Sequence, residues 1–393
     1  MLIHKVKQLW QKNHEWLIKD ILNPFIFTRL ALLIVGWFSQ YFKPSDDYFS
    51  QEIVQRTWEF TNNRLLDIWG RWDSVWYVSI IREGYFVRGD LNTVQSNLAF
   101  FPLYPYLVKF LALLTPSQSL ASENLLIIGI ILSNLFLLGA LVILYKLTLT
   151  LFHNPKIAKL TIIYLLFFPT AFFFSAFYTE SIFLFFSVAS FYAAKKNNWG
   201  LAAMMGGLAS LTRSPGVILF IPIILEYLKA HHWSIKKIRI NILFLFFIPS
   251  TFLIFLINLY PLSGDILAPV KLQSAWLKET AMPWETIFNP NNVKPYLTSV
   301  DQIITIIFLV LLLISFFYLR LSLSLYAFIL MLMPLTTGTL ASVPRYCLVI
   351  FPIFILLGYL GNKKESLNQA IKIIFLTLQI LFFTAWCQFY WFV

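Results

Sequence analysis

NLLIIGIILSNLFLLGALVILY, residues 124–145, is an apolar run without a single charged side chain. About 20 such residues in an α-helix cross the hydrocarbon core of a bilayer. Comparable runs recur along the chain, in which 59% of residues are hydrophobic, 12% are charged and the mean hydropathy is +0.73. The sequence therefore predicts an all-α polytopic membrane protein, with residues 1–393 forming a single domain.

The distribution of basic residues predicts the orientation. The apolar segments are 24–42, 124–145, 157–176, 179–194, 199–212, 215–229, 240–262, 302–319, 321–342, 345–361 and 370–392. If all of them cross the membrane, 17 of the 30 lysine and arginine residues fall on one side, which the positive-inside rule makes cytosolic. We therefore expect a bundle of about 11 transmembrane helices. The +12 net charge reflects this topology and does not indicate nucleic-acid binding.

Two long loops then lie on the external side. Residues 43–123 form a large first external loop with amphipathic helices, and 263–301 form a second. Within the first loop, the apolar stretch 99–114 is predicted to be an interfacial or re-entrant helix, because a full crossing would reverse the charge pattern. Residues 1–21 are basic and mildly amphipathic without the pattern of a signal peptide, which predicts a cytosolic interfacial helix.

The segment 199–229 is expected to break into two short helices at LTRSPG, residues 211–216. Pro215 and Gly216 are suited to ending a helix, and an unbroken segment would place the basic residues that follow it outside. Backbone that leaves the helix at membrane depth is tolerated where it lines a protein cavity, so Arg213 is expected to point into one.

The first external loop contains the most unusual carboxylate of the chain, in LLDIWGRWDSVWYVSIIREGY, residues 65–85. Drawn as one helix, this segment puts Trp69, Trp72, Trp76 and Ile80 on one face with Asp73 in the middle of it. A carboxylate among indole rings is costly to desolvate, so a residue of this kind indicates a function that uses it. Taken alone, the segment is equally compatible with a carboxylate that caps a neighbouring loop.

Other polar motifs share the predicted external side with Asp73. They are FFPLYP (100–105), FYTE (177–180), LTRS (211–214), QSAW (273–276) and VPRY (343–346). Because a random scatter of motifs would not select one side, this convergence predicts a functional site there.

The ordered set RWDSVWYVSIIREGY, FFPLYP, FYTE, LTRSPG and PRY resembles the PIG-V family, which comprises GPI mannosyltransferase 2-like enzymes of the GT-C class. This resemblance implies a GT-C-like bundle with a catalytic acid in its first external loop. It implies transfer of a sugar, mannose by analogy, from a polyprenyl-phosphate donor with inversion. Asp73 matches the catalytic acidic residue and is expected to act as general base. Where many GT-C relatives have two adjacent acids, this chain has Asp73 alone, as the PIG-V pattern allows.

The remaining candidates would bind substrate. They are Trp72, Tyr104, Glu180, Arg213, Gln273, Trp276, Arg345 and Tyr346. Arg213 and Arg345 suit a departing phosphate, although arginines at a membrane interface also snorkel. Two of these residues have an equally good structural interpretation. Glu180 could stabilise the positive N-terminus of a helix, and Trp276 could belong to the aromatic belt at the membrane interface.

No cofactor is expected, and a lone Asp73 makes a poor site for a divalent metal, although one is not excluded. All five histidines fall on the predicted cytosolic side, and the two cysteines lie in apolar segments. The expected partners are the membrane, the polyprenyl-phosphate-sugar donor and a lipid or glycan acceptor. The main alternative function is a lipid or solute transporter or flippase, which would place ionisable groups along a midplane path. The short loops and the absence of N-x-S/T sequons favour a bacterial cytoplasmic membrane over an endoplasmic reticulum.

Overall fold

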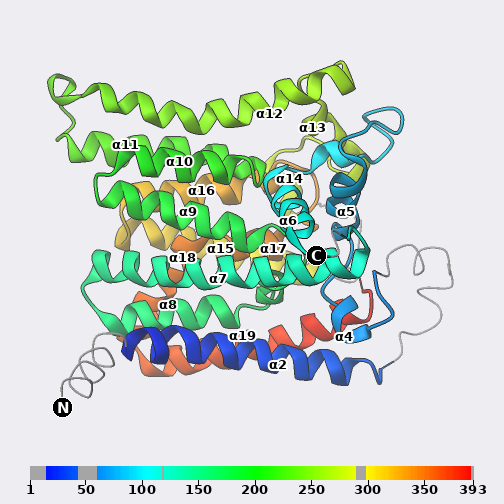
Figure 1. The fold of residues 1–393 in the computed structure, drawn as a ribbon. Helices are drawn as coiled ribbons and strands as arrows, with labels where there is room; N and C mark the ends of the chain where they lie inside the picture. The colour runs from blue at the N-terminus through cyan, green and yellow to red at the C-terminus, as the bar shows by residue number, and fades with distance from the viewer. Residues whose placement is uncertain (1–14, 43–59, 117–118, 289–297, 391–393) are drawn as a thin grey trace, which may run out of the picture.

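The computed structural model describes residues 15–42, 60–116, 119–288 and 298–390, and the regular elements in these ranges are all helices. Five of them are long and apolar enough to cross a membrane (Figure 1). They are η1 with α2 (Leu17–Leu22 and Asn23–Ser39), α7 (Ser122–Phe152), η6 with α12 (Ile240–Phe246 and Phe247–Ser263), α15 (Thr298–Tyr318) and α19 (Glu365–Cys387).

Shorter helices run alongside these five in the bundle. They are α8 (Pro155–Phe167), α9 (Glu180–Lys195), α10 (Trp199–Ser210), α11 (Phe220–Ala230), α16 (Leu321–Leu335) and α18 (Phe351–Lys363). The protein is thus an all-helical integral membrane protein over its described residues, whereas a total of about 11 transmembrane helices stays a prediction.

The two ends of the bundle differ in what they carry. At one end, which we call the site end, lie α4 (Arg64–Asp67), α5 (Ser74–Glu83), α6 (Leu103–Leu114), α13 (Ala268–Lys271) and α14 (Pro283–Phe288). At the opposite end the chain reverses direction through short turns, several of which carry basic residues. The predicted external loops therefore gather at the site end.

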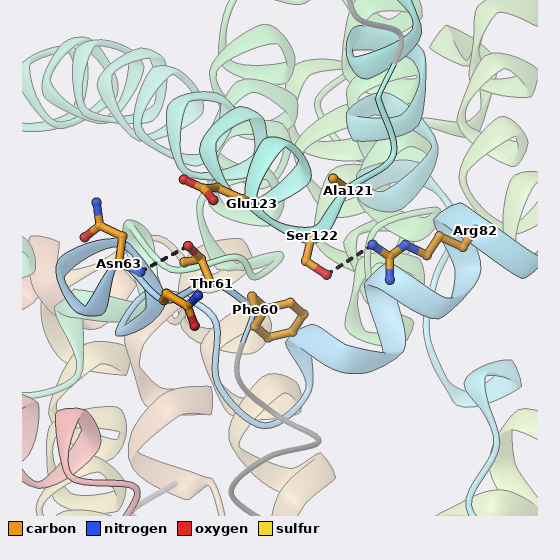
Figure 2. A pocket seen from close by; sticks show the side chains of 8 residues that line it. Phe60, Thr61, Asn63, Arg82, Ala121, Ser122 and Glu123 are labelled. Atoms are coloured by element: carbon orange, nitrogen blue, oxygen red, sulfur yellow. Dashed lines mark hydrogen bonds between the residues drawn. The ribbon is translucent and has the colours of Figure 1, made fainter.

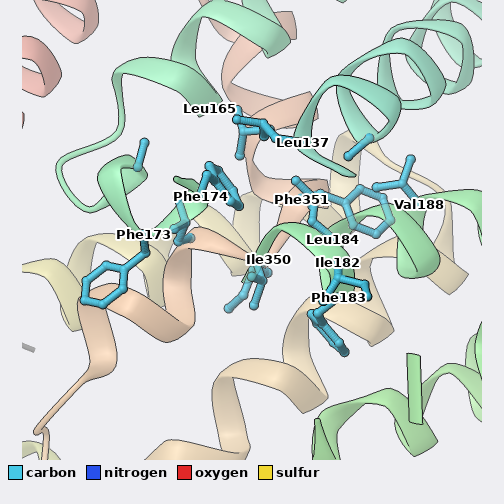
Figure 3. Packing of buried hydrophobic residues seen from close by; sticks show 14 of the residues in the cluster. Leu137, Leu165, Phe173, Phe174, Ile182, Phe183, Leu184, Val188, Ile350 and Phe351 are labelled. Atoms are coloured by element: carbon cyan, nitrogen blue, oxygen red, sulfur yellow. The ribbon is translucent and has the colours of Figure 1, made fainter. Parts of the chain in front are cut away.

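Helix α9 lies at the centre of the bundle and is buried on every face. Its residues Ile182 and Leu184 pack with Leu137 of α7 and Leu165 of α8 (Figure 3). A helix that is apolar all round is stable only when neighbours cover it completely. Because α9 begins at Glu180, this packing fixes the position of that carboxylate at the site end.

Residues 168–179, which connect α8 to α9, are buried without forming an α-helix. Only a short 3₁₀ turn, η3 (Ala171–Phe174), interrupts this connection. Gly129 of α7 makes room for it, since a Cβ there would lie 2.2 Å from the Phe177 ring. The apolar segment 157–176 is therefore helical only as far as Phe167, because Pro169 and the close approach to α7 favour an irregular path.

Residues 65–85, on which the tryptophan face was drawn as one helix, form two helices with a turn between them. Helix α4 ends at Asp67, α5 begins at Ser74, and Trp72 between them has a φ of 52°. The shared tryptophan face is absent as a result: Trp69 packs on Phe383, whereas Trp76 stacks on Phe100 and meets Trp276. The buried Asp67 carboxylate accepts hydrogen bonds from the Phe60 and Thr61 N–H groups and from Arg71 at this turn.

The predicted break at residues 211–216 is present. Helix α10 ends at Ser210, Arg213 is extended, and the 3₁₀ helix η4 (Ser214–Leu219) follows. Gly216 is required at this point because a Cβ would lie 2.3 Å from the backbone of Ala209.

Two further segments bear on the predicted topology. Helix α6 has 12 residues, so at about 18 Å it is shorter than a bilayer core. The expected interfacial helix over 1–21 lies largely outside the described residues, and its described part continues into α2 as one apolar helix from Leu17.

Candidate functional site

Asp73 lies at the site end as the N-cap residue of α5, and its side chain makes no capping hydrogen bond. Its backbone N–H donates to the Tyr178 hydroxyl at 3.1 Å, and that hydroxyl donates to the carbonyl of Arg71 at 2.9 Å. The carboxylate oxygen Oδ2 accepts from Arg345 Nη1 at 2.7 Å. The side chain is 24% exposed, and its other oxygen has no partner among the described residues. One oxygen of Asp73 is therefore held while the other is open.

The irregular segment before α9 holds this turn in place. The Phe177 N–H donates to the carbonyl of Trp69 at 2.9 Å, and the Ser74 hydroxyl donates to the carbonyl of Phe177 at 3.2 Å. These two hydrogen bonds fix the backbone on both sides of Asp73. The position of the carboxylate is thus set in part by buried backbone contacts.

Glu180 joins two arginines that come from distant parts of the chain. Arg213 Nη1 donates to Glu180 Oε1, and Arg345 Nε lies 3.8 Å from the same oxygen. The Glu180 side chain is only 1% exposed. It therefore holds the two arginines from a buried position in the first turn of α9, and its contact with a substrate stays a prediction.

Three cations surround the ring of Tyr346, which lies on the short helix α17 (Val343–Leu348). Arg213, Lys278 and Arg345 lie 5.7, 5.5 and 5.5 Å from the ring centroid. Lys278 Nζ also donates to the Tyr346 hydroxyl at 3.0 Å and to Gln273 Oε1 at 3.3 Å. Gln273 therefore reaches the cluster through Lys278.

Lys278 is the member of this cluster that the sequence did not reveal. It follows η7 (Leu272–Trp276) and Leu277, which has a φ of 58°. No carboxylate in the described part of the chain lies within ion-pair distance of it, whereas Arg213 and Arg345 both have carboxylate partners. Its only sequence signal is proximity to QSAW.

The site holds more positive than negative charge. Arg213, Lys278 and Arg345 face two carboxylates, Asp73 and Glu180. Partly buried charges are weakly screened, so an uncompensated cation in such a place attracts an anion strongly. The arrangement is suited to an anionic group placed beside an open carboxylate oxygen.

The aromatic candidates lie in different surroundings. Trp276 of η7 meets Trp76 of α5 and Phe100 edge-on and so joins these two parts of the site end. Tyr104 is fully buried, and its hydroxyl is hydrogen-bonded to the Gly129 carbonyl and to Ser133. Tyr104 therefore lies within the packing of α6 on α7, apart from the charged cluster. Trp72 directly precedes Asp73 in the turn.

The described residues contain no group of three or more His, Cys, Asp or Glu side chains that could hold a metal ion. Metal independence stays a prediction.

These features define a polytopic membrane protein with an anion-attracting charged site at one end of its bundle. The family model described as Mannosyltransferase (PIG-V) matches residues 18–264. The chain therefore belongs to the PIG-V mannosyltransferase family. The matched range includes Asp73, Glu180 and Arg213, whereas Lys278 and Arg345 lie beyond it.

Two curated relatives carry the description GPI mannosyltransferase 2. The protein of Schizosaccharomyces pombe is 32% identical over 152 residues, which are 38% of this chain and 30% of the relative. That of Yarrowia lipolytica is 28% identical over 173 residues, which are 44% of each chain. The matched regions thus span less than half the length of these relatives. Both are fungal and give the predicted bacterial membrane no support.

Proposed function

We propose that this chain is an inverting membrane mannosyltransferase that uses a polyprenyl-phosphate-linked sugar as donor and the hydroxyl of a lipid or glycan as acceptor. Its site end faces the external or luminal side, because the turns rich in lysine and arginine lie at the opposite end of the bundle. Membership of the PIG-V family supports the class of reaction.

The proposed general base is Asp73. As the acceptor oxygen attacks the anomeric carbon, its proton passes to the open carboxylate oxygen of Asp73. The bond from the anomeric carbon to the phosphate oxygen breaks, and the phosphate leaves with the electron pair. Attack opposite the leaving group inverts the anomeric configuration. A positioned base contributes about 10²–10⁴-fold to such a step.

The surplus of cations around Tyr346 is the observation that carries the proposal. A departing polyprenyl phosphate gains negative charge, and preorganised donors stabilise charge that develops during reaction. Arg213 and Arg345 have carboxylate partners that orient them, whereas the partners of Lys278 among the described residues are the Gln273 amide and the Tyr346 hydroxyl. We assign Lys278 as the principal contact for the leaving phosphate, with the arginines beside it.

Purified protein in lipid nanodiscs would test the donor class. It should transfer labelled mannose from a polyprenyl-phosphate donor to an added acceptor extract and should not use a nucleotide-linked sugar. NMR of the isolated product should show inverted anomeric configuration. A protein that moves the donor lipid across the bilayer without breaking its sugar–phosphate bond would contradict the proposal and indicate a transporter.

A further inference from the structure

The connection between α11 and η6, at the end of the bundle opposite the site, exposes an unusual mixture of side chains. It has the sequence KAHHWSIKKIRI, residues 229–240, and contains the 3₁₀ helix η5 (Ile235–Lys237). We call it the 229–240 loop. In Figure 1 it lies where α11 passes into α12 along the outer edge of the bundle. Because the membrane-spanning stretch of η6 with α12 begins at Ile240, the loop lies where the chain enters the membrane.

Hydrogen bonds at both ends hold this loop in a defined shape. The Trp233 N–H donates to the Leu228 carbonyl at 2.8 Å and closes the end of α11. The hydroxyl of the buried Tyr227 accepts from the Arg239 N–H at 2.9 Å and so ties the far end of the loop to α11. His232 and Trp233 both have a φ of 57°, which residues other than glycine rarely adopt. The direction of the side chains in the loop is therefore set by the fold.

Large apolar side chains of the loop point away from the protein. Trp233 is 58% exposed, Ile235 85% and Ile240 84%. Trp199, which begins α10 at the same end of the bundle, is only 5% exposed because it packs against Tyr227. Apolar area of this kind is stabilised when hydrocarbon covers it, and tryptophan is enriched at the membrane interface. The apolar part of the loop therefore fits the boundary of the bilayer that α12 enters.

Exposed basic side chains lie among the apolar ones. They are Lys229, Lys236, Lys237 and Arg239. These groups form no ion pair within the described residues, since 227–264 contain no aspartate or glutamate and the preceding Glu226 pairs with Arg320. Their positive charge is thus uncompensated by the protein.

A surface arginine at the site end shows the contrast. Arg82 donates to the Leu120 carbonyl at 2.9 Å and to the Ser122 hydroxyl at 3.1 Å, in a surface depression that Glu123 also lines (Figure 2). The protein itself therefore supplies acceptors to Arg82 and a carboxylate to its surroundings. The 229–240 loop has basic groups without either, and such a surface attracts an anion.

We propose that the 229–240 loop binds the headgroups of anionic lipids in the leaflet at the end opposite the site, with Trp233, Ile235 and Ile240 seated among the lipid chains. The topology of a membrane protein accounts for lysines in such a loop, but not for an exposed indole and two exposed isoleucines between them. A molecule with an anionic head and a hydrocarbon tail satisfies both halves of the surface. The assignment is independent of the reaction proposed at Asp73.

The first experiment removes charge from the loop and counts the bound lipids. The variant combines Lys236→Gln and Lys237→Gln. The matched control combines Lys363→Gln and Lys364→Gln, which are exposed in the α18–α19 turn at the same end of the bundle, where Glu365 lies beside them. Native mass spectrometry would count the lipids retained from nanodiscs of phosphatidylcholine that contain a minor fraction of phosphatidylglycerol.

Wild type and the control should retain phosphatidylglycerol in preference to phosphatidylcholine. The loop variant should lose about tenfold of that preference, because each basic residue near a membrane surface adds to the attraction of anionic lipid. High salt should weaken the preference of the wild type in the same direction. No preference in the wild type, or an undiminished one in the loop variant, would overturn the assignment.

The second experiment locates the apolar side chains. Cys347 and Cys387 are buried, so Ile235→Cys supplies an accessible thiol for an environment-sensitive fluorophore. In nanodiscs this label should be quenched by nitroxide on the lipid chains and protected from aqueous iodide, whereas a label at Lys364→Cys should be quenched by iodide. Quenching of the Ile235→Cys label by iodide and not by the lipid nitroxide would place the loop in water. That result would overturn the assignment and indicate a surface for a soluble partner.

Discussion

Two aspartates that each pair with an arginine, Asp67 and Asp73, lie six residues apart around the turn between α4 and α5, and their surroundings differ sharply. Asp67 pairs with Arg71 inside the turn, where the side chains are 6% and 4% exposed. Asp73 pairs with Arg345 from the far end of the chain, and its side chain is 24% exposed. The first pair is closed to solvent, whereas the second is open.

The hydrogen bonds of the two carboxylates differ in the same sense. Asp67 accepts from two backbone N–H groups as well as from Arg71, so its acceptor capacity is largely used. Asp73 accepts from Arg345 at one oxygen only. Charge pairing is common to both, so pairing alone does not mark a catalytic acid. An accessible oxygen that has no partner in the described part of the chain distinguishes Asp73.

The largest effect on stability is expected at the closed pair. Asp67→Asn would remove the charge of a carboxylate that pairs with the buried Arg71 guanidinium, and breaking a buried ion pair of this kind costs about 3–5 kcal/mol. The thermal unfolding temperature in detergent should fall markedly, and activity should fall only as folded protein is lost. If Asp67→Asn stayed as stable as wild type yet lost turnover per folded molecule, the distinction between the two pairs would fail.

A smaller and purely catalytic effect is expected from Arg345→Lys. Lysine keeps the charge but lacks the planar group that reaches Asp73 and Glu180 together. Turnover should fall about ten- to a hundredfold with little change in unfolding temperature.

Arg320→Lys is the control for that change. Arg320 forms an ion pair with Glu226 at the opposite end of the bundle. The Ser322 hydroxyl also donates a hydrogen bond to the Glu226 carboxylate. The Arg320→Lys variant should have the same turnover as the wild-type protein. Equal losses in the two lysine variants would indicate that arginine pairs matter for packing in general and not for the site.

The smallest effect is expected from removing one cation. Lys278→Gln should weaken inhibition by free polyprenyl phosphate about tenfold, because the leaving phosphate loses its uncompensated partner. Lys271→Gln is the matched change, since Lys271 is exposed in the same loop and paired with Asp265. Inhibition constants measured for both variants check the assignment, which an unchanged value for Lys278→Gln would contradict.

Hydropathy and charge counting predicted the helical membrane class and placed Asp73, Glu180, Arg213 and Arg345 on one side. These inferences succeed because a bilayer imposes long-range order on apolar runs and basic loops. The break near Arg213 was equally visible, since Pro215 and Gly216 act locally.

What escaped sequence reasoning depends on tertiary contacts. The tryptophan spacing in 65–85 fits a helix, but the buried bonds of Asp67 and the close approach of Phe60 at Gly70 favour a turn. No sequence motif marks Lys278. Its place beside Tyr346 follows from the way the chain after η7 packs against α17.

The most direct test of the central claim is the rate of sugar transfer by Asp73→Asn. The measurement would use initial rates with a polyprenyl-phosphate mannose donor, at equal amounts of folded protein in nanodiscs, with donor binding measured in parallel. Removing the proton acceptor while keeping the shape should lower the rate about 10²–10⁴-fold and leave donor binding and unfolding temperature nearly unchanged. Transfer at close to the wild-type rate would contradict the assignment of Asp73 as the general base.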